Sequence, residues 1–307
     1  MVGGSKRVTQ MIESDDQTLQ LMEFIVSGGR FGINVAKVSE IMKYSQHPIT
    51  PMPNSNPFVE GIFRPRTETM TVINLAAYMG LPPSEDETRD ILIITKLNNV
   101  ETAFHVHGVE AIDTVKLSEI EKPDSTIYGG EEGMATGIAK YEDRLITIID
   151  FEKILIDISP NMGFSPSDID KLGNRSRSMK PIMVAEDSPL LERLIISSLE
   201  KAGYVNITCA ANGQEAWSLL EGYKASNLPI EEHVCAVITD IEMPLMDGHR
   251  LLKLMKEDAK LKKLPVIVFS SLITDDNRAT GNRLGAVANI SKPEIANLVT
   301  ILDQHIL

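Results

Sequence analysis

The chain has 307 residues, of which 43% are hydrophobic and 24% charged, a composition typical of a globular protein with about two domains. Its net charge of −13 and pI of about 5.0 disfavour general binding to a nucleic-acid backbone. No apolar run predicts a signal peptide or a membrane-inserted span, and two cysteines are too few for a disulfide framework. We therefore expect a cytoplasmic protein with reduced thiols.

The first part of the chain has mostly strand character. Residues 1–17 form a leader without a clear pattern, and residues 18–158 are the first predicted domain. There, LQLMEFIV is followed by SGG and then by FGINVAKVSEIM, which predicts a hairpin with glycine in its turn. TMTVINL, DILIITKL and TAFHVHGVEAI predict further strands, and LITIIDFEKIL predicts a last strand followed by a short helix.

A weak internal repeat runs through this part of the chain. GINVAKVSEI at 32–41 resembles AFHVHGVEAI at 103–112. EGIFRPRTETMTVINLAAYM at 60–79 likewise resembles TGIAKYEDRLITIIDFEKIL at 136–155. The repeat predicts two similar small β units packed together, an arrangement that would also protect the edges of many short strands.

A linker and an alternating α/β segment follow. Residues 159–179 are rich in Ser, Pro, Gly and Asn, which favours a linker. Residues 180–307 contain five apolar strand patterns, each followed by a helical pattern: PIMVAED, VNITCA, VCAVITD, LPVIVFSS and VANIS. Strands of this kind predict a five-stranded parallel sheet with helices on both faces and right-handed crossovers.

Polar residues stand where four of these strands end. Glu186 and Asp187 follow the first strand, Asp240 the third, Ser270 the fourth and Lys292 the fifth. Because the carboxyl ends of parallel strands meet at one edge of a sheet, we expect these side chains to share a crevice. Three carboxylates suit Mg²⁺, and an aspartate beside Mg²⁺ is a good phosphoryl acceptor, with the lysine and the hydroxyl stabilising the transferred group.

Residues 180–307 resemble the receiver domain of two-component response regulators. The resemblance is carried by VAEDS, VITDIEMPLMDG, VIVFSS and SKP. It implies that Asp240 is the phosphoacceptor and that a histidine kinase is the donor. It also implies that Asp187 and Asp240 bind Mg²⁺, with Glu186 acting through water and Glu242 contributing its backbone carbonyl.

Four positions depart from the commonest receiver pattern. Glu186 stands where the first acidic residue is more usually Asp, and Ser270 stands where Thr is frequent. Asn289 occupies a position, three residues before the lysine, that is often aromatic. Glu242 places a carboxylate two residues after the acceptor, close to where water would attack the phosphoryl group.

Residues 18–158 resemble the CheW-like adaptor domain of bacterial chemotaxis. The resemblance is carried by FGINVAKVSEIM, FVEGIFRPRTETMTVINL and GIAKYEDRLITIIDFEKIL. It implies an all-β fold of two five-stranded barrels. Where the family has an Asn-Leu-Arg-Gly loop, this chain reads Arg64-Pro65-Arg66-Thr67, so Arg66 keeps the arginine and becomes a candidate partner-binding residue.

The order of the two domains resembles that of the CheV family of chemotaxis coupling proteins. This resemblance implies a non-enzymatic adaptor at chemoreceptor arrays that binds methyl-accepting chemotaxis proteins and the CheA histidine kinase. Phosphotransfer from CheA to Asp240 would regulate this coupling. One alternative is a receiver that serves only as a phosphate sink on an independent scaffold.

Two other interpretations start from single motifs. The DIE sequence at 240–242 mimics the Asp-x-Asp of haloacid dehalogenase-type phosphatases, although Glu242 replaces the required second Asp. His105 and His107 lie two residues apart on a predicted strand and so share one face, which could form half of a metal site. A solvated strand face is the expected reason for this spacing.

Overall fold

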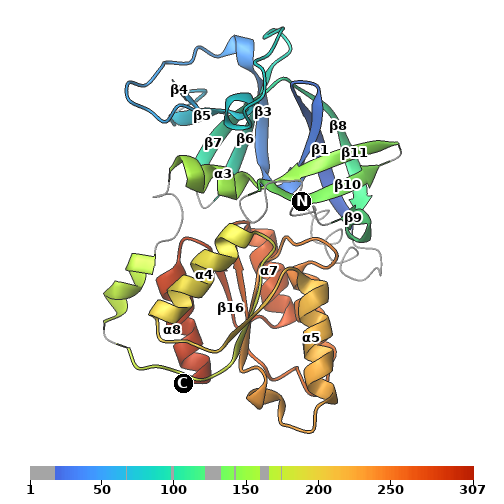
Figure 1. The fold of residues 1–307 in the computed structure, drawn as a ribbon, viewed down its shortest axis with the longest axis vertical. Coiled ribbons are helices and arrows are strands. Elements are labelled where there is room, and N and C mark those ends of the chain that lie inside the picture. The colour runs from blue at the N-terminus through green and yellow to red at the C-terminus, as the bar shows by residue number, and fades with distance from the viewer. Residues whose placement is uncertain are drawn as a thin grey trace. The chain divides into compact units, whose positions relative to one another are not determined.

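The computed structural model describes residues 18–66, 68–97, 100–121, 133–141, 143–159, 166–173 and 175–307. The predicted leader at 1–17 and Thr67 of the candidate partner-binding loop lie outside these ranges. The elements form two compact units, one from β1 to α3 and the other from η6 to α8 (Figure 1). Within the described ranges, every helix is too short or too polar to span a bilayer.

The N-terminal unit contains two β-sheets. The first has the order β8 (Gly108–Lys116), β1 (Thr18–Val26), β2 (Gly29–Asn34), β11 (Arg144–Ile149), β10 (Ala135–Tyr141) and β9 (Ile120–Glu121). The second has the order β3 (Val38–Lys43), β6 (Ile91–Leu97), β7 (Val100–Val106), β5 (Met70–Asn74) and β4 (Val59–Phe63). This confirms the β-rich fold, but the first sheet gains a sixth strand, the two-residue β9.

The strand orders confirm the internal repeat. The central strands correspond as β6 to β1, β7 to β2 and β5 to β11, and the outer strands as β3 to β8 and β4 to β10. Both sheets contain one parallel pair at the same place, β5 with β7 and β11 with β2. Each sheet nevertheless draws strands from both copies, because the chain changes sheets between β2 and β3 and again between β7 and β8.

The two copies end in short helices, α2 (Leu75–Tyr78) and α3 (Phe151–Ile158). Asn74 caps the first helix and Asp150 caps the second, each by accepting a backbone N–H three residues on. Phe151, fully buried at the start of α3, packs edge-on against Phe24 of one sheet and Phe104 of the other. This aromatic contact joins the two sheets in one core.

The C-terminal unit is built on one parallel sheet. Its order is β13 (Ile207–Ala210), β12 (Ile182–Ala185), β14 (Ala236–Thr239), β15 (Val266–Ser270) and β16 (Ala288–Ser291). The helices are α4 (Pro189–Lys201), α5 (Gly213–Ala225), α6 (Gly248–Glu257), α7 (Asp275–Leu284) and α8 (Ile295–Ile306). All strand pairs are parallel, as the alternating pattern predicts.

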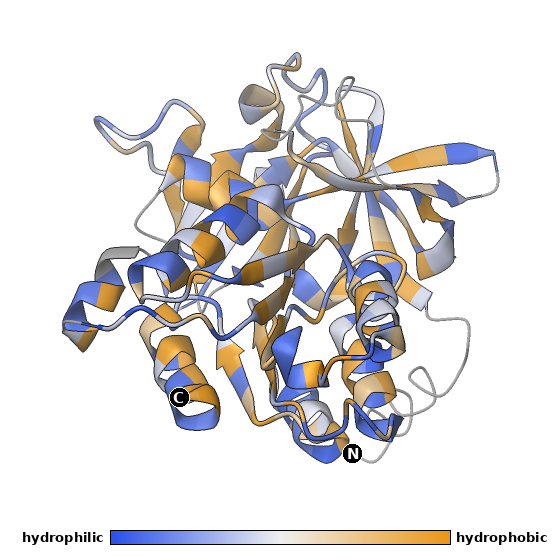
Figure 2. Cartoon of the chain, turned by 60° about the horizontal axis from the view of Figure 1, so that its bottom comes forward, coloured by the Kyte–Doolittle hydropathy of each residue, from blue (hydrophilic) through white to orange (hydrophobic). Residues whose placement is uncertain are grey.

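Helices cover both faces of this sheet. Helix α4 contacts α8, and α6 contacts both α5 and α7. Figure 1 shows α4 and α8 on one side of the sheet and α5 and α7 on the other. Figure 2 shows apolar and polar residues alternating along α8, whose buried positions are Ile295, Leu298, Val299 and Leu302. This spacing places one apolar stripe against the sheet.

Residues 166–173 and 175–179, here called the docking segment, lie within the predicted linker. Their 3-10 helix η6 (Pro166–Leu172) packs against α4 and α8 and buries Ile169. Further on, Arg175 Nε donates to the Ala202 carbonyl at 2.8 Å, and the same guanidinium pairs with Asp303. Part of the predicted linker is therefore attached to the C-terminal unit, while the domain boundaries themselves remain predictions.

Candidate functional site

The strand-end carboxylates come together because β12 and β14 are in register. Ala185 lies opposite Thr239, so the residues that follow, Glu186 and Asp240, leave the sheet side by side. The Asp240 N–H donates to the Ala185 carbonyl at 3.0 Å, which extends the ladder to the site itself. One oxygen each from Glu186, Asp187 and Asp240 falls within 4.8 Å of the others, as the sequence predicts for a shared crevice.

Lys292 lies between two of these carboxylates. Its Nζ is 2.7 Å from Asp240 Oδ2 and 3.1 Å from Glu186 Oε2. These three side chains are at most 5% exposed, whereas Asp187 is half-buried. In this low-dielectric position, each charge interacts strongly with its neighbours.

The charges of the cluster do not balance. Three carboxylates against one ammonium leave two formal negative charges at one edge of the sheet. Oxygen ligands with surplus negative charge and one partly open side are what Mg²⁺ prefers. The residues therefore fit a divalent cation held by Glu186, Asp187 and Asp240 beside the Lys292 ammonium.

The loop after Asp240 fixes the backbone of this residue through a close contact. The Gly248 N–H donates to the Ile241 carbonyl at 2.9 Å and closes the loop. A Cβ on Gly248 would lie 1.8 Å from the Asp240 carbonyl oxygen, so only glycine fits there. Leu245, at φ 63°, adds a left-handed turn residue between these points. The aspartate after the loop, Asp247, caps α6.

The remaining predicted receiver residues lie close by in the fold. Ser270 is buried at the end of β15, and its Oγ accepts the Leu272 N–H at 3.2 Å. Its carbonyl accepts the Lys292 N–H at 3.2 Å, which links the two strand ends. Glu242 is half-buried in the loop, and the ligand role of its backbone carbonyl stays a prediction.

Arg66, the candidate partner-binding residue, lies in the loop between β4 and β5. Its side chain is 74% exposed, and Nη2 reaches both carboxylate oxygens of Glu40 at 3.0 and 3.1 Å. An exposed ion pair of this kind contributes little to stability. The guanidinium is thus held on the surface of the second sheet without being needed for the fold.

His105 is not on a solvated strand face, so that expectation is wrong. The side chain is buried, with Nδ1 2.7 Å from Glu60 Oε1 and Nε2 2.9 Å from Asp90 Oδ2. The Tyr44 ring stacks on the imidazole at 3.9 Å between centroids. His107 on the same strand instead accepts the Ser27 N–H through Nδ1, so the two histidines do not combine as metal ligands.

The two carboxylates favour the protonated form of His105. Burial alone lowers its pKa, but hydrogen bonds and charge from Glu60 and Asp90 outweigh burial, so the pKa of His105 is raised. Burial and the Glu60 charge also raise the pKa of Tyr44 to about 12. The sequence did not predict this cluster because His105, Glu60 and Asp90 come from three separate segments of the chain. Only His105 had been singled out from the sequence.

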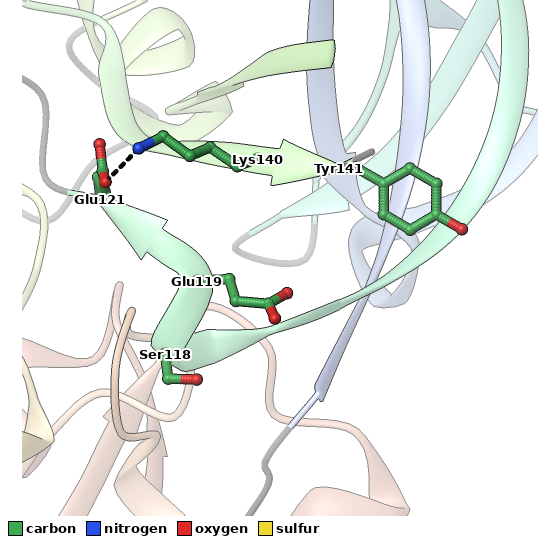
Figure 3. Close-up of a pocket in the computed structure, with 5 residues that line it drawn as sticks. All are labelled: Ser118, Glu119, Glu121, Lys140 and Tyr141. Atoms are coloured by element: carbon green, nitrogen blue, oxygen red, sulfur yellow. Dashed lines mark hydrogen bonds and ion pairs between the residues drawn. The ribbon is translucent and has the colours of Figure 1, made fainter. Parts of the chain in front are cut away.

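A separate pocket of about 560 Å³ lies beside β9 and β10 of the first sheet (Figure 3). It is lined by Ser118, Glu119, Glu121, Lys140 and Tyr141. Figure 3 shows the Lys140 side chain directed at Glu121, and the two make an ion pair of 2.6 Å. Both partners are more than half exposed, so this ion pair contributes little to stability.

Comparison with known protein families matches both units. The profile of the CheW-like domain matches residues 20–159, and that of the response regulator receiver domain matches residues 182–303. These two matches account for the two β-sheets and for the parallel α/β sheet.

Three relatives are informative. Chemotaxis protein CheV3 of Helicobacter pylori is 28% identical over 286 residues, covering 89% of this chain and 90% of that protein. CheV1 of the same organism is 25% identical over 324 residues, covering 99% of this chain and 98% of the relative. Chemotaxis protein CheW of Bacillus subtilis is 32% identical over 138 residues, covering 44% of this chain and 86% of that protein.

Proposed function

Because the chain belongs to the CheW-like family and is a CheV-like chemotaxis coupling protein with an added receiver domain, we propose that phosphorylation of Asp240 regulates its coupling. In this proposal the CheW-like domain binds chemoreceptors and the CheA histidine kinase. The protein would then act in the cytoplasm at receptor arrays, as an adaptor and not as an enzyme with turnover.

The buried cluster supports a single phosphoryl transfer. A carboxylate oxygen of Asp240 would attack the phosphorus of a phosphohistidine, forming a P–O bond while the P–N bond to the kinase imidazole breaks. Lys292, 2.7 Å from Asp240 Oδ2, would balance the charge that the phosphoryl oxygens bring. Ser270 at the neighbouring strand end has a hydroxyl that could donate to one of these oxygens.

Mg²⁺ held by Glu186, Asp187 and Asp240 would supply charge neutralisation between the acceptor and the incoming phosphoryl group. The chain's own contribution is to fix the acceptor: Ile241 N–H donates to Asp240 Oδ1 at 2.5 Å, and Gly248 packs on the Asp240 backbone. The observation that carries the proposal is the convergence of three carboxylates and a buried lysine at one sheet edge.

The test begins with the full-length protein, phosphorylated CheA and Mg²⁺. We expect one phosphoryl group per chain on the wild type and none on Asp240→Asn, followed by altered affinity for the receptor–kinase complex. Steady release of phosphate from a phosphomonoester would instead indicate a phosphatase. Phosphorylation that leaves receptor–kinase binding unchanged would identify a phosphate sink.

A further inference from the structure

Helix α7 packs against a buried amide side chain on strand β16. Asn289, in the middle of β16 and three residues before Lys292, is 8% exposed. Its Nδ2 donates to Asn282 Oδ1 on α7 at 2.8 Å. A Cβ built on Gly281 would lie 2.0 Å from Asn289 Oδ1, so α7 can sit this close only because residue 281 is glycine.

This amide contact is incompletely satisfied. Asn289 Oδ1 is buried and has no hydrogen-bond partner among the described residues. A buried acceptor without a donor is costly, so the contact stabilises this position of α7 less than a fully hydrogen-bonded amide would. A contact of this kind can hold the helix and still release it.

The other end of α7 is connected to the candidate acceptor site. Ser270 Oγ accepts the Leu272 N–H at 3.2 Å, and the Leu272 carbonyl accepts Asn277 Nδ2 on the first turn of α7 at 2.8 Å. If the Ser270 hydroxyl turns toward a phosphoryl oxygen, the Leu272 backbone must adjust and carry the start of α7 with it. Asn282 lies more than one helical turn after Asn277 on α7. Its contact with Asn289 would oppose that movement of the helix.

We propose that Asn289 and Asn282 form a latch that holds α7 against β16 and opposes modification of Asp240. The inference rests on the proposed phosphoacceptor function. Both asparagines are positioning residues, since neither touches the reacting atoms. Opening the latch should therefore favour the modified state, whereas a purely structural contact would only stabilise the fold.

The experiment titrates beryllofluoride, a mimic of the aspartyl phosphoryl group, into full-length protein at fixed Mg²⁺. Amide exchange in the loop 241–247 reports occupancy. For Asn289→Ala and Asn282→Ala we expect half-saturation at a concentration about fivefold lower than in the wild type, the effect of one neutral hydrogen bond. Because both changes remove the same contact, the double variant should gain no more than either single variant.

Two control variants accompany the titration. Asn282 is exposed, and Asn282→Asp keeps an acceptor oxygen for Asn289 Nδ2, so it should bind like the wild type. Asn297→Ala removes an exposed amide on α8 that bonds Glu294, and should also have no effect. If Asn289→Ala does not fold, Asn282→Ala alone decides the question because its side chain is exposed.

Several outcomes would overturn the latch. Alanine variants that bind no more tightly than the wild type, or whose effects add in the double variant, would show that the contact is not coupled to the site. An equal gain for Asn297→Ala would have the same meaning. These results would overturn the latch but not the role of Asp240 as acceptor. If beryllofluoride never saturates the wild type, or if the wild type responds no more than Asp240→Asn, both the latch and the proposed function are overturned.

Discussion

Each unit of the protein contains a buried basic side chain between two carboxylates. In the receiver domain Lys292 lies between Glu186 and Asp240, and in the CheW-like domain His105 lies between Glu60 and Asp90. The distances from the basic nitrogen atoms to the carboxylate oxygens are similar in the two arrangements. Their surroundings differ, and the difference separates a site suited to binding from a cluster suited to holding the fold.

Around His105, neutral groups add further hydrogen bonds to the two carboxylates. Asn74 donates to Glu60 at 2.5 Å, Ser84 donates to Asp90 at 2.7 Å, and Tyr44 covers the imidazole ring. The receiver cluster instead adds a third carboxylate, the half-buried Asp187. Hydrogen bonds from neutral groups offset part of the cost of burying the carboxylates of Glu60 and Asp90, whereas a third carboxylate with an open side favours binding of a cation.

The largest effect is expected from Lys292→Met. Without Mg²⁺, removing the buried ammonium should lower the free energy of unfolding of the receiver domain by about 3–5 kcal/mol, because two carboxylates lose their cation. Millimolar Mg²⁺ should recover part of this loss by binding the folded state. Urea unfolding followed by Trp217, the chain's single tryptophan, measures this domain. If Lys292→Met loses the same free energy of unfolding with and without Mg²⁺, the Lys292 cluster does not differ from the His105 cluster in binding a cation.

A smaller loss is expected from His105→Gln. Two charge-assisted hydrogen bonds disappear, so the CheW-like domain should lose about 2–3 kcal/mol of unfolding free energy, with no recovery by Mg²⁺. His107→Gln on the same strand is the matched control and should cost less. Calorimetry of the whole chain can follow both domains. Rescue of His105→Gln by Mg²⁺ would mean that this cluster, too, binds metal.

The pH dependence of stability should distinguish the two clusters further. Because the pKa of His105 is raised in the folded state, its contribution is fully present below the unfolded pKa of about 6.5 and is lost as pH rises through the folded value. Thermal melts of the CheW-like domain from pH 6 to 9 should show this decline. The decline should be weaker in His105→Gln. A wild type and variant with parallel pH profiles would exclude His105 as the titrating group.

The smallest change in stability is expected at Arg66. Arg66→Ala breaks an exposed ion pair and should alter the unfolding free energy by less than about 0.5 kcal/mol. Binding to the receptor–kinase complex should nevertheless weaken if Arg66 contacts a partner. Glu40→Ala breaks the same pair from the other side and should leave binding intact. Equal binding by both variants would make Arg66 an ordinary surface residue.

The sequence predicted the receiver cluster better than the histidine cluster for a geometric reason. Strand-end residues of a parallel sheet always meet at one edge, so Glu186, Asp240 and Lys292 could be grouped without knowing any packing. His105 on β7 meets Glu60 on β4 and Asp90 just before β6 only through the order β6, β7, β5 and β4 in the second sheet. Because side chains alternate along a strand, the sequence predicts that His105 and His107 share one face. It does not predict which of the two histidines is buried.

The attachment of the docking segment was also beyond sequence reasoning. Its composition is that of a linker, yet Ile169 is buried and Arg175 pairs with Asp303 far along the chain. Composition reports average flexibility and does not reveal single anchoring contacts. The same holds for Gly248 and Gly281, whose importance lies in atoms that approach them from other segments.

The exchange of strands between the two sheets has a consequence for folding. Copy one supplies β1 and β2 to the first sheet and β3, β4 and β5 to the second, and copy two supplies the complementary strands. Neither copy contains a complete sheet, so neither can form a core before the other has been synthesised. The domain is the single-chain equivalent of a strand-swapped homodimer. Its many pairings between distant segments should make its folding slower than that of the receiver domain.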